Sequence, residues 1–145
     1  GLGHRELAEV NRAKLIEELR RDEGVKLKLY KCTAGKWSVG CGRNLSDNGI
    51  STDEMLLMLH NDIDAASKGL DRALPWWREM SEPRQRALVN MCFNLGLPRL
   101  LQFKTMLRHL EAGEYDAAAD AALDSRWALQ VGERSERIAE LFRKG

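Results

Sequence analysis

The sequence predicts an α+β fold with two lobes, in which a small N-terminal β-hairpin lobe is joined by a long helix to a C-terminal helical bundle. Three observations lead to this prediction. Apolar residues alternate with other residues only around positions 25–41, which is strand spacing. Elsewhere apolar residues recur every three or four positions, as in helices, and 145 residues suit one domain. We expect a cleft between the lobes, where ligands usually bind.

The charge and cysteine content exclude several classes of protein. Lys and Arg number 23 against 22 Asp and Glu, whereas proteins that bind phosphate backbones usually carry a basic excess, so we expect no nucleic-acid partner. The longest apolar stretches are too short to cross a bilayer, so we expect no stable membrane insertion. Three cysteines without a CxxC pair, and three scattered histidines, predict neither a disulfide framework nor a metal site, and we expect no cofactor.

The first lobe is expected to hold one helix and one hairpin. The helix covers about residues 4–23 and ends before Gly24, where a cap of positive φ is expected. The hairpin lobe covers about residues 24–50, with its turn at residues 33–35. The apolar stripe of the helix consists of Leu7, Val10, Leu15, Ile16 and Leu19; the apolar strand positions are Val25, Leu27, Leu29, Trp37, Val39 and Cys41, and Cys41 is expected in the core.

The rest of the chain is predicted to be helical. Ser51 and Glu54 form a capping box that opens a linking helix over about 52–73. The helical bundle covers about 81–145; its central helix begins at Ser81-Glu82-Pro83, ends at Gly96 and is expected to be buried. Shorter helices are expected at about 99–111, 114–124 and 133–143. Expected buried residues are Leu56, Leu59, Ile63 and Ala66 on the linking helix, together with Cys92, Tyr115, Trp127 and one of Trp76 and Trp77.

Asp22 and Glu23 break a local rule at the end of the first helix. Acids in the last turn face the negative end of the helix dipole, which costs about 0.3–1 kcal/mol each if they are exposed. Such violations are typical of functional sites, and the dipole disfavours the ionised form of Glu23, as a general acid requires. A frayed, solvated helix end explains the same residues, and from this position alone it is the favoured interpretation.

The residues that follow favour the functional interpretation. Glu23, eight residues, Cys32, five residues and Ser38 form a spaced motif, flanked by DEG, LKxYK and VGxG elements. This region resembles the active site of the bacteriophage lysozymes of the T-even type, glycoside hydrolase family 24. The resemblance implies one lysozyme-like catalytic domain over 1–145, although the first dozen residues have no clear counterpart. Further matching segments are Asp62–Ala66, Asn90–Asn94 with Gly96, and Ser125–Trp127 with Gln130, Arg134 and Arg137.

The resemblance implies that the chain hydrolyses peptidoglycan between N-acetylmuramic acid and N-acetylglucosamine. Glu23 would protonate the leaving oxygen, while Cys32 and Ser38 would act on the water or transition-state side. In the family that the chain resembles, the position of Cys32 more often holds a carboxylate, and the position of Ser38 holds a Thr. Since an ordinary thiol is mostly protonated at neutral pH, the role of Cys32 as base, nucleophile or water-positioner stays open.

Other residues are implied to support or line this site. Arg134 is expected to pair with Glu23, and Arg137 with Asp22. Arg43 is expected either to pair with Asp62 or to be an ordinary surface residue. The candidates that line the glycan cleft are Tyr30, Phe93 and Asn94, with a plain core position as the alternative for Phe93.

The predicted protein is a monomeric phage endolysin whose partner is bacterial peptidoglycan. It would be made in the host cytoplasm and reach the cell wall in the periplasm through a holin or another release route. The competing prediction is a non-catalytic glycan-binding or phage tail component with a decayed site, which the cysteine at position 32 alone favours. A helical adaptor for other proteins is a third class, but it does not explain the hairpin motif.

Overall fold

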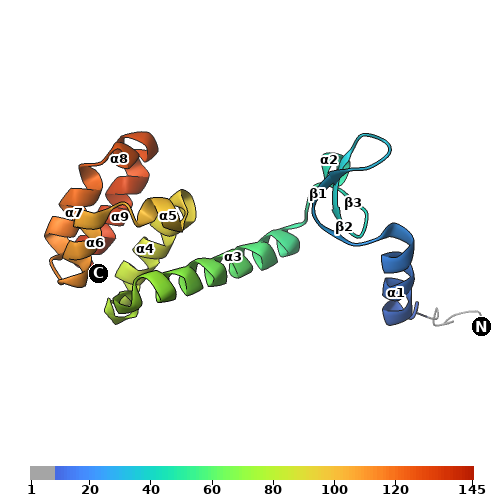
Figure 1. The fold of residues 1–145 in the computed structure, drawn as a ribbon, viewed down its shortest axis with the longest axis horizontal. Helices are drawn as coiled ribbons and strands as arrows, with labels where there is room; N and C mark the ends of the chain where they lie inside the picture. Colours follow the sequence, from blue (N-terminus) through green and yellow to red (C-terminus); the bar gives the residue numbers. More distant parts are fainter. Residues whose placement is uncertain (1–8) are drawn as a thin grey trace, which may run out of the picture. The chain divides into compact units, whose positions relative to one another are not determined.

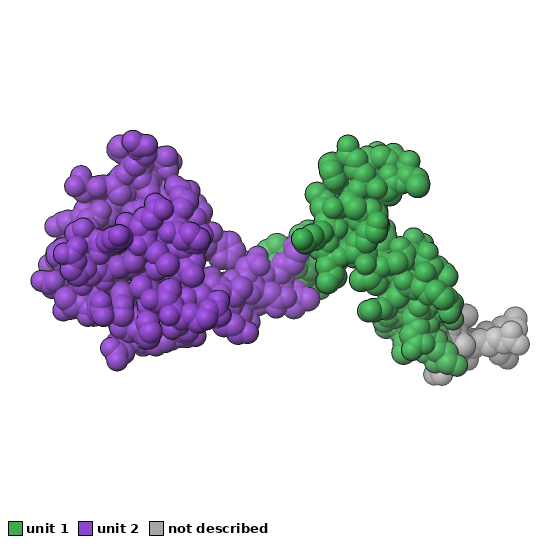
Figure 2. All heavy atoms as spheres, in the orientation of Figure 1, with its two compact units in different colours: residues 1–55 green, residues 56–145 purple. Residues whose placement is uncertain are grey.

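The computed structural model describes residues 9–145 and divides the chain into two compact units, residues 1–55 and residues 56–145 (Figure 2). Each unit is described by itself. The predicted helical residues 4–8, which include His4 and Leu7, lie outside the described residues. The α+β class is confirmed, because a small antiparallel sheet in the first unit accompanies a chain that is otherwise largely helical (Figure 1).

Helix α1 spans Arg12–Glu23 and begins later than predicted. The side chain of Asn11 accepts a hydrogen bond from the backbone N–H of Lys14 at 3.1 Å and so caps the helix there. Val10 therefore precedes the helix. The side chains of the predicted apolar stripe, Leu15, Ile16 and Leu19, are exposed.

The sheet contains β1 (Lys26–Lys31), β2 (Trp37–Gly40) and β3 (Arg43–Asn44), paired antiparallel in that order. The predicted hairpin turn is confirmed by two backbone hydrogen bonds of 2.9 Å between Cys32 N–H and Lys36 O and between Gly35 N–H and Cys32 O. Neither β3 nor the short helix α2 (Leu45–Asn48) was predicted. Cys41 is exposed rather than in the core, because it leaves β2 for a turn, where its thiol donates to Leu19 O at 3.2 Å.

Helix α3 spans Thr52–Ala73, which are the predicted bounds. The capping box forms as expected: Glu54 Oε1 accepts from Ser51 N–H at 2.8 Å, and Ser51 Oγ accepts from Glu54 N–H at 3.1 Å. The predicted buried face is wrong for Leu56, Leu59 and Ile63, which are exposed. Only the C-terminal part of α3, from Ala66 onward, packs on the core of the second unit.

The second unit continues with a 3₁₀-helix, Pro75–Glu79, and then helices alone. Its central helix, α4, follows N-cap Ser81 and precedes Gly96, as predicted. The helix predicted at 99–111 is two helices interrupted at residues 101–103, and a short helix, α8, was missed. The helices are α4 (Glu82–Leu95), α5 (Leu97–Leu100), α6 (Lys104–Glu111), α7 (Tyr115–Leu123), α8 (Arg126–Val131) and α9 (Glu133–Lys144).

The core of the second unit forms around α4, whose buried position was predicted. Cys92 is buried there, as are Trp77 and Trp127, while Trp76 and Tyr115 are partly buried against the same core. The other buried side chains of α4 are Ala87, Leu88, Met91 and Leu95. No helix within residues 9–145 has both the length and the apolar character needed to span a membrane.

Candidate active site

Glu23 is the last residue of α1, and its carboxylate lies against the turn between β2 and β3. A Cβ built on Gly42 would lie 3.2 Å from Glu23 Oε2, and Gly42 has a φ of +78°. Both the close approach and the positive φ favour glycine at this position. Gly24, with a φ of +74°, ends the helix directly after Glu23. The exposed Glu23 side chain therefore lies between this helix end and the turn that contains Gly42.

Cys32 and Ser38 lie together across the hairpin. Cys32 follows the end of β1, and its thiol is half-buried. Ser38 in β2 is 2% exposed, and among residues 9–55 it is the one residue that is buried. Its hydroxyl donates to the backbone carbonyl of Lys36 at 3.5 Å and is also one of the groups that lower the pKa of the Cys32 thiol. The structure therefore brings together two of the three residues of the sequence motif.

Hydrogen bonds around the sulfur hold the pKa of the Cys32 thiol below its usual value. The backbone N–H of Lys36 contributes most, followed by that of Ala34, and the Ser38 hydroxyl adds a smaller effect. Burial acts in the opposite direction. Because these hydrogen-bond donors stabilise the thiolate, Cys32 is a stronger candidate for a deprotonated catalytic group than an ordinary cysteine.

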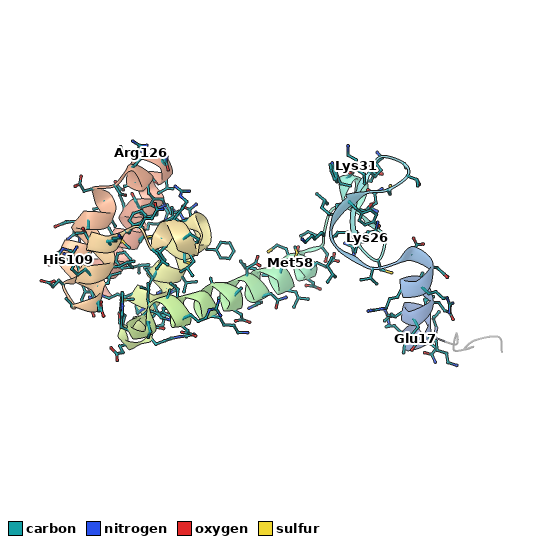
Figure 3. All side chains as sticks on the ribbon, in the orientation of Figure 1. Glu17, Lys26, Lys31, Met58, His109 and Arg126 are labelled. Atoms are coloured by element: carbon teal, nitrogen blue, oxygen red, sulfur yellow. The ribbon has the colours of Figure 1, made fainter. Side chains whose placement is uncertain are left out.

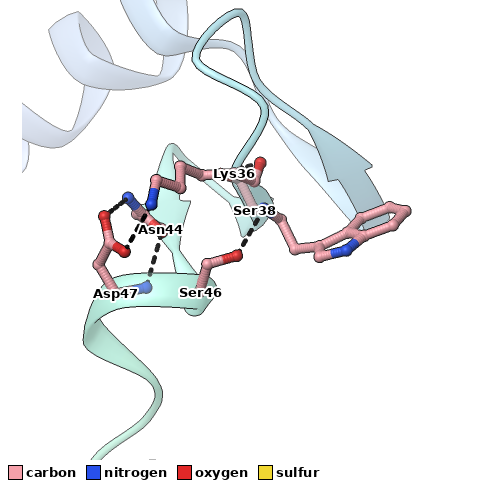
Figure 4. A network of polar contacts seen from close by, with 6 residues as sticks. Lys36, Ser38, Asn44, Ser46 and Asp47 are labelled. Carbon is pink, nitrogen blue, oxygen red and sulfur yellow. Dashed lines mark hydrogen bonds and ion pairs between the residues drawn. The ribbon is translucent and has the colours of Figure 1, made fainter.

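A polar network fixes the strand that carries Ser38 (Figure 4). Lys36 Nζ lies 3.1 Å from Asp47 Oδ1, and Ser46 Oγ accepts from the backbone N–H of Trp37 at 2.8 Å. Both partners belong to α2, so this short helix is tied to the start of β2. Sequence reasoning missed Ser46 and Asp47, although Asn44 three residues before Asp47 is a helix-capping pattern that could have indicated α2.

Tyr30 is placed on the same face of the sheet as Ser38, because the two residues pair directly between β1 and β2. Its ring is half-buried and lies 4.6 Å below Lys26 Nζ, in a cation–π contact. This phenol therefore belongs to the same small surface as the Cys32–Ser38 pair.

Within its own unit Arg43 pairs with Glu54, while the predicted pair with Asp62 would join the two units and stays a prediction. Its guanidinium binds Glu54, with Nη2 at 2.6 Å from Oε2, and also donates to Gly49 O at 3.2 Å. Glu54 is available because the capping box already holds its carboxylate at the start of α3. Hydrogen bonds from Arg43 first, and then from Ser51, lower the pKa of Glu54 to about 2.

In the second unit, Phe93 lines an apolar groove of about 460 Å³ on α3, α4 and α9. It is 45% exposed, so the alternative of a plain core position is wrong. Arg134, at the edge of the groove, donates two hydrogen bonds to Asn90 Oδ1, at 2.8 and 3.0 Å. The other lining residues are Leu59, Ile63, Arg86 and Val89.

The remaining predicted residues of the second unit lie apart from this groove or at its border. Asn94 accepts from Trp127 Nε1 at 2.8 Å, a bond that ties α4 to α8. Asp62 is exposed on α3 and lines a second groove of about 420 Å³, which Phe93 also borders. Arg137 lies on the exposed, acid-rich face of α9.

The site candidates in the first unit are Asp22, Glu23, Tyr30, Cys32, Ser38 and Arg43, and those in the second unit are Asp62, Phe93, Asn94, Arg134 and Arg137. The predicted pairs of Arg134 with Glu23 and of Arg137 with Asp22 would join the two units and stay predictions. Within its own unit, Asp22 Oδ1 lies 3.5 Å from Arg21 Nε. Among the described residues no cluster of three or more His, Cys, Asp or Glu side chains is arranged to hold a metal ion.

Comparison with known families identifies the chain. The family model described as phage lysozyme matches residues 20–144, which include Glu23, Cys32 and Ser38. The chain belongs to the phage lysozyme family. It is therefore a glycoside hydrolase of the lysozyme class, and the expected family resemblance is confirmed.

The relatives of this phage lysozyme family member include lysozymes, endolysins and a spike protein. A probable T4-type lysozyme 2 of Dictyostelium discoideum is 25% identical over 90% of this chain and 94% of its own length. An endolysin of Salmonella phage P22 is 28% identical over 74% of the chain and 77% of its own length. The pre-baseplate central spike protein Gp5 of Enterobacteria phage T4 is 28% identical, but the chain spans only 28% of that protein's length.

Proposed function

We propose that this lysozyme is a muramidase that cuts the β-1,4 bond between N-acetylmuramic acid and N-acetylglucosamine in bacterial peptidoglycan. One observation carries the proposal: the unit that presents the Glu23 carboxyl also presents the Cys32 thiol, whose pKa is lowered by backbone N–H groups and, to a smaller extent, by the buried Ser38. Two groups, one to give a proton and one to act on the water side, are what glycoside hydrolysis requires.

In the proposed reaction, Glu23 in its acid form donates a proton to the glycosidic oxygen as the bond from that oxygen to the anomeric carbon breaks. A water molecule attacks the anomeric carbon, and Cys32 in its thiolate form takes the proton that this water loses. The Ser38 hydroxyl orients the thiolate or the water. Of the three roles left open for Cys32, the lowered pKa favours the base.

Residues of both units are proposed to bind the glycan, so that the whole chain acts as one catalytic domain. Tyr30 would contact a sugar from the first unit, and Phe93 and Asn94 from the second. The exposed ring of Phe93 can stack on a sugar face, because it lines a groove instead of filling the core. Arg134 and Arg137 would then pair with Glu23 and Asp22.

We further propose that the protein is a monomeric phage endolysin that lyses the host cell. The endolysin of Salmonella phage P22 supports this assignment by its name and by the share of both chains that aligns. In this proposal the enzyme is made in the host cytoplasm and reaches the cell wall through a holin or another route. The reaction needs neither a metal nor an organic cofactor.

The test is to incubate purified peptidoglycan with the protein and to identify the new reducing-end sugar by mass spectrometry. We expect muropeptides that end in N-acetylmuramic acid, and about 10²- to 10⁴-fold slower release by Glu23→Gln. Glu18→Gln is the matched control, since it removes another exposed acid from α1. A new reducing end at N-acetylglucosamine would contradict the proposed bond, and full activity of Glu23→Gln would contradict the assigned acid.

A second candidate function is a domain of a larger phage tail component, in which glycan binding continues without cleavage. The similarity to the central spike protein of phage T4 favours it, because this chain spans 28% of that protein. The peptidoglycan assay described above distinguishes the two candidate functions. Retention on peptidoglycan without any new reducing end would favour the tail component over the endolysin.

A further inference from the structure

The backbone of Lys36 lies beside Cys32 at the turn of the β1–β2 hairpin. Its carbonyl accepts from the backbone N–H of Cys32 at 2.9 Å and from the Ser38 hydroxyl at 3.5 Å. Its N–H is the largest of the effects that lower the pKa of the Cys32 thiol. Cys32 directly follows Lys31, which is labelled on the hairpin in Figure 3. The surroundings of the sulfur therefore depend on the position of one residue across the turn.

Two side chains of α2 bind this residue and the next. Ser46 Oγ accepts from the backbone N–H of Trp37 at 2.8 Å, and Asp47 Oδ1 lies 3.1 Å from Lys36 Nζ (Figure 4). The N–H of Trp37 and the carbonyl of Lys36 belong to the same peptide group. Because a peptide group is planar, a hydrogen bond that holds its N–H also orients its carbonyl. Ser46 therefore helps to direct the Lys36 carbonyl toward Cys32.

Helix α2 is itself fixed next to Ser38. Its N-cap, Asn44, pairs with Ser38 between β2 and β3. The Asn44 side chain accepts from the backbone N–H of Asp47 at 3.0 Å and donates to Asp47 Oδ2 at 2.9 Å. One oxygen of Asp47 is thus bound by Asn44 while the other faces Lys36. A carboxylate that is already ordered loses less conformational entropy when it holds a partner.

A contribution to stability alone is a weak explanation of these contacts. The side chains of Lys36 and Asp47 are both about half-exposed, and exposed ion pairs contribute little to stability. Both contacts nevertheless act on residues 36 and 37, directly before the buried Ser38. Their place in the sheet therefore favours a role in the geometry around Cys32.

We propose that Ser46 and Asp47 are positioning residues for the reaction, because they hold the Lys36 backbone beside Cys32. The inference rests on the proposed function, in which Cys32 takes a proton from water. Without these contacts, residues 36 and 37 can move away from Cys32, and the thiolate loses hydrogen-bond donors. Neither Ser46 nor Asp47 touches the reacting atoms in this proposal.

The proposed effect of Asp47 on the thiol is opposite in sign to a plain charge effect. Loss of the Asp47 carboxylate removes a negative charge and leaves Lys36 without this partner, and both changes alone would lower the pKa of Cys32. Loss of position instead takes donors away from the sulfur and raises that pKa. Loss of the Ser46 hydroxyl changes the position without changing any charge.

The test measures how the rate of Cys32 alkylation by iodoacetamide depends on pH, with peptide mass spectrometry to separate the three cysteines. We expect the midpoint to lie at higher pH in Ser46→Ala and in Asp47→Ala than in the wild type. Ser46→Thr keeps the hydroxyl and should restore the wild-type midpoint. Asp53→Ala is the matched control, because it removes another exposed acid from the first turn of a helix, and it should leave the midpoint unchanged.

The second readout is the pH profile of peptidoglycan cleavage. Each alanine variant should lower kcat about threefold to tenfold at pH values where the thiol is protonated, a small part of the about 10²- to 10⁴-fold that a positioned base contributes. KM should not change. The loss should disappear as the pH rises past the pKa of Cys32, whereas a loss caused by unfolding would persist. Hydrogen–deuterium exchange of β1 and β2 checks that the hairpin stays folded.

The outcomes separate this inference from the proposed function. For either residue, an unchanged or lower midpoint in its alanine variant, with the hairpin folded, would overturn its positioning role whatever the activity. A rise in Asp53→Ala as large as that in Asp47→Ala would overturn the role of Asp47. Higher midpoints in both alanine variants, together with a wild type that releases no muropeptides, would support the positioning and overturn the proposed function.

Discussion

The two units of the chain are stabilised by different interactions. Among residues 9–55, only Ser38 is buried, and the first unit is held by turns, helix caps and exposed ion pairs such as that of Arg43 with Glu54. In the second unit, apolar side chains of every helix from α3 to α9 form one continuous core around α4. Burial of apolar surface is the larger stabilising effect of the two.

Because of this difference, the candidate catalytic residues and the stabilising core lie in different units of the chain. The candidates for the reaction, Glu23, Cys32 and Ser38, all lie in the unit without an apolar core, whereas the residues that hold the fold lie in the other. Substitutions in the first unit should therefore change activity more than stability. Substitutions in the core of the second unit should do the reverse.

The largest expected effect on stability is that of Phe142→Ala. Phe142 is fully buried in α9, so its truncation removes apolar contacts and leaves a cavity, which should lower the free energy of unfolding by about 3–5 kcal/mol. Phe93→Ala is the matched control, because its ring is half-exposed, and it should cost less than about 1 kcal/mol. Urea unfolding followed by circular dichroism measures both, and equal losses would contradict the assignment of stability in the second unit to its buried core.

The pH dependence of the stability of Glu54→Gln tests how much the ion pair of Arg43 with Glu54 stabilises the first unit. The pKa of Glu54 is lowered from 4.5 to about 2 in the folded protein, so the ionised form favours folding. That contribution is present above pH 4.5 and is lost as the pH falls toward 2. We expect the thermal midpoint of the wild type to fall over this range more steeply than that of Glu54→Gln.

Asp53→Gln is the control, since Asp53 is also an exposed acid in the first turn of α3. The thermal midpoint of Asp53→Gln should change with pH in the same way as that of the wild type. Identical curves for Glu54→Gln and the wild type would show that the Arg43 pair contributes nothing to folding. High salt should reduce the effect, because both partners are exposed.

The smallest expected effect is a change in the pKa of Cys32. The rate of alkylation by iodoacetamide should reach half its maximum at a pH below the usual value for a thiol, because backbone N–H groups stabilise the thiolate. Ser38→Ala should move this midpoint upward, and by less than loss of the backbone donors would, because the hydroxyl is a minor cause of the lowered pKa. Peptide mass spectrometry separates Cys32 from Cys41, and a midpoint at or above the usual value would contradict the structure.

The helix boundaries that the sequence predicts well are those with a local signal. The capping box at Ser51 and Glu54 locates the start of α3. Pro83 in the first turn and Gly96 after the last turn locate α4. These signals are local, because each residue acts on the backbone next to it in sequence. Helix α8 was missed because six residues give too short a period to recognise, although Ser125 caps it by accepting from Ala128 N–H at 3.1 Å.

Burial and long-range partners are predicted less well, since they depend on neighbours that are distant in sequence. The period of Leu56, Leu59 and Ile63 indicates an apolar face but not what covers it, and these side chains are exposed. Spacing also located Cys32 and Ser38 but could not show the hydrogen-bond donors that lower the pKa of the Cys32 thiol. The sequence also did not indicate the ion pair of Arg43 with Glu54, because spacing gives no distance between side chains.

The most direct measurement is to determine the rate of peptidoglycan cleavage and the free energy of unfolding on the same preparations of the wild type and Glu23→Gln. The account predicts that the rate falls about 10²- to 10⁴-fold while the free energy of unfolding changes by less than about 1 kcal/mol. An unchanged rate, or a loss of activity that follows a loss of stability, would contradict the placement of the chemistry in the first unit.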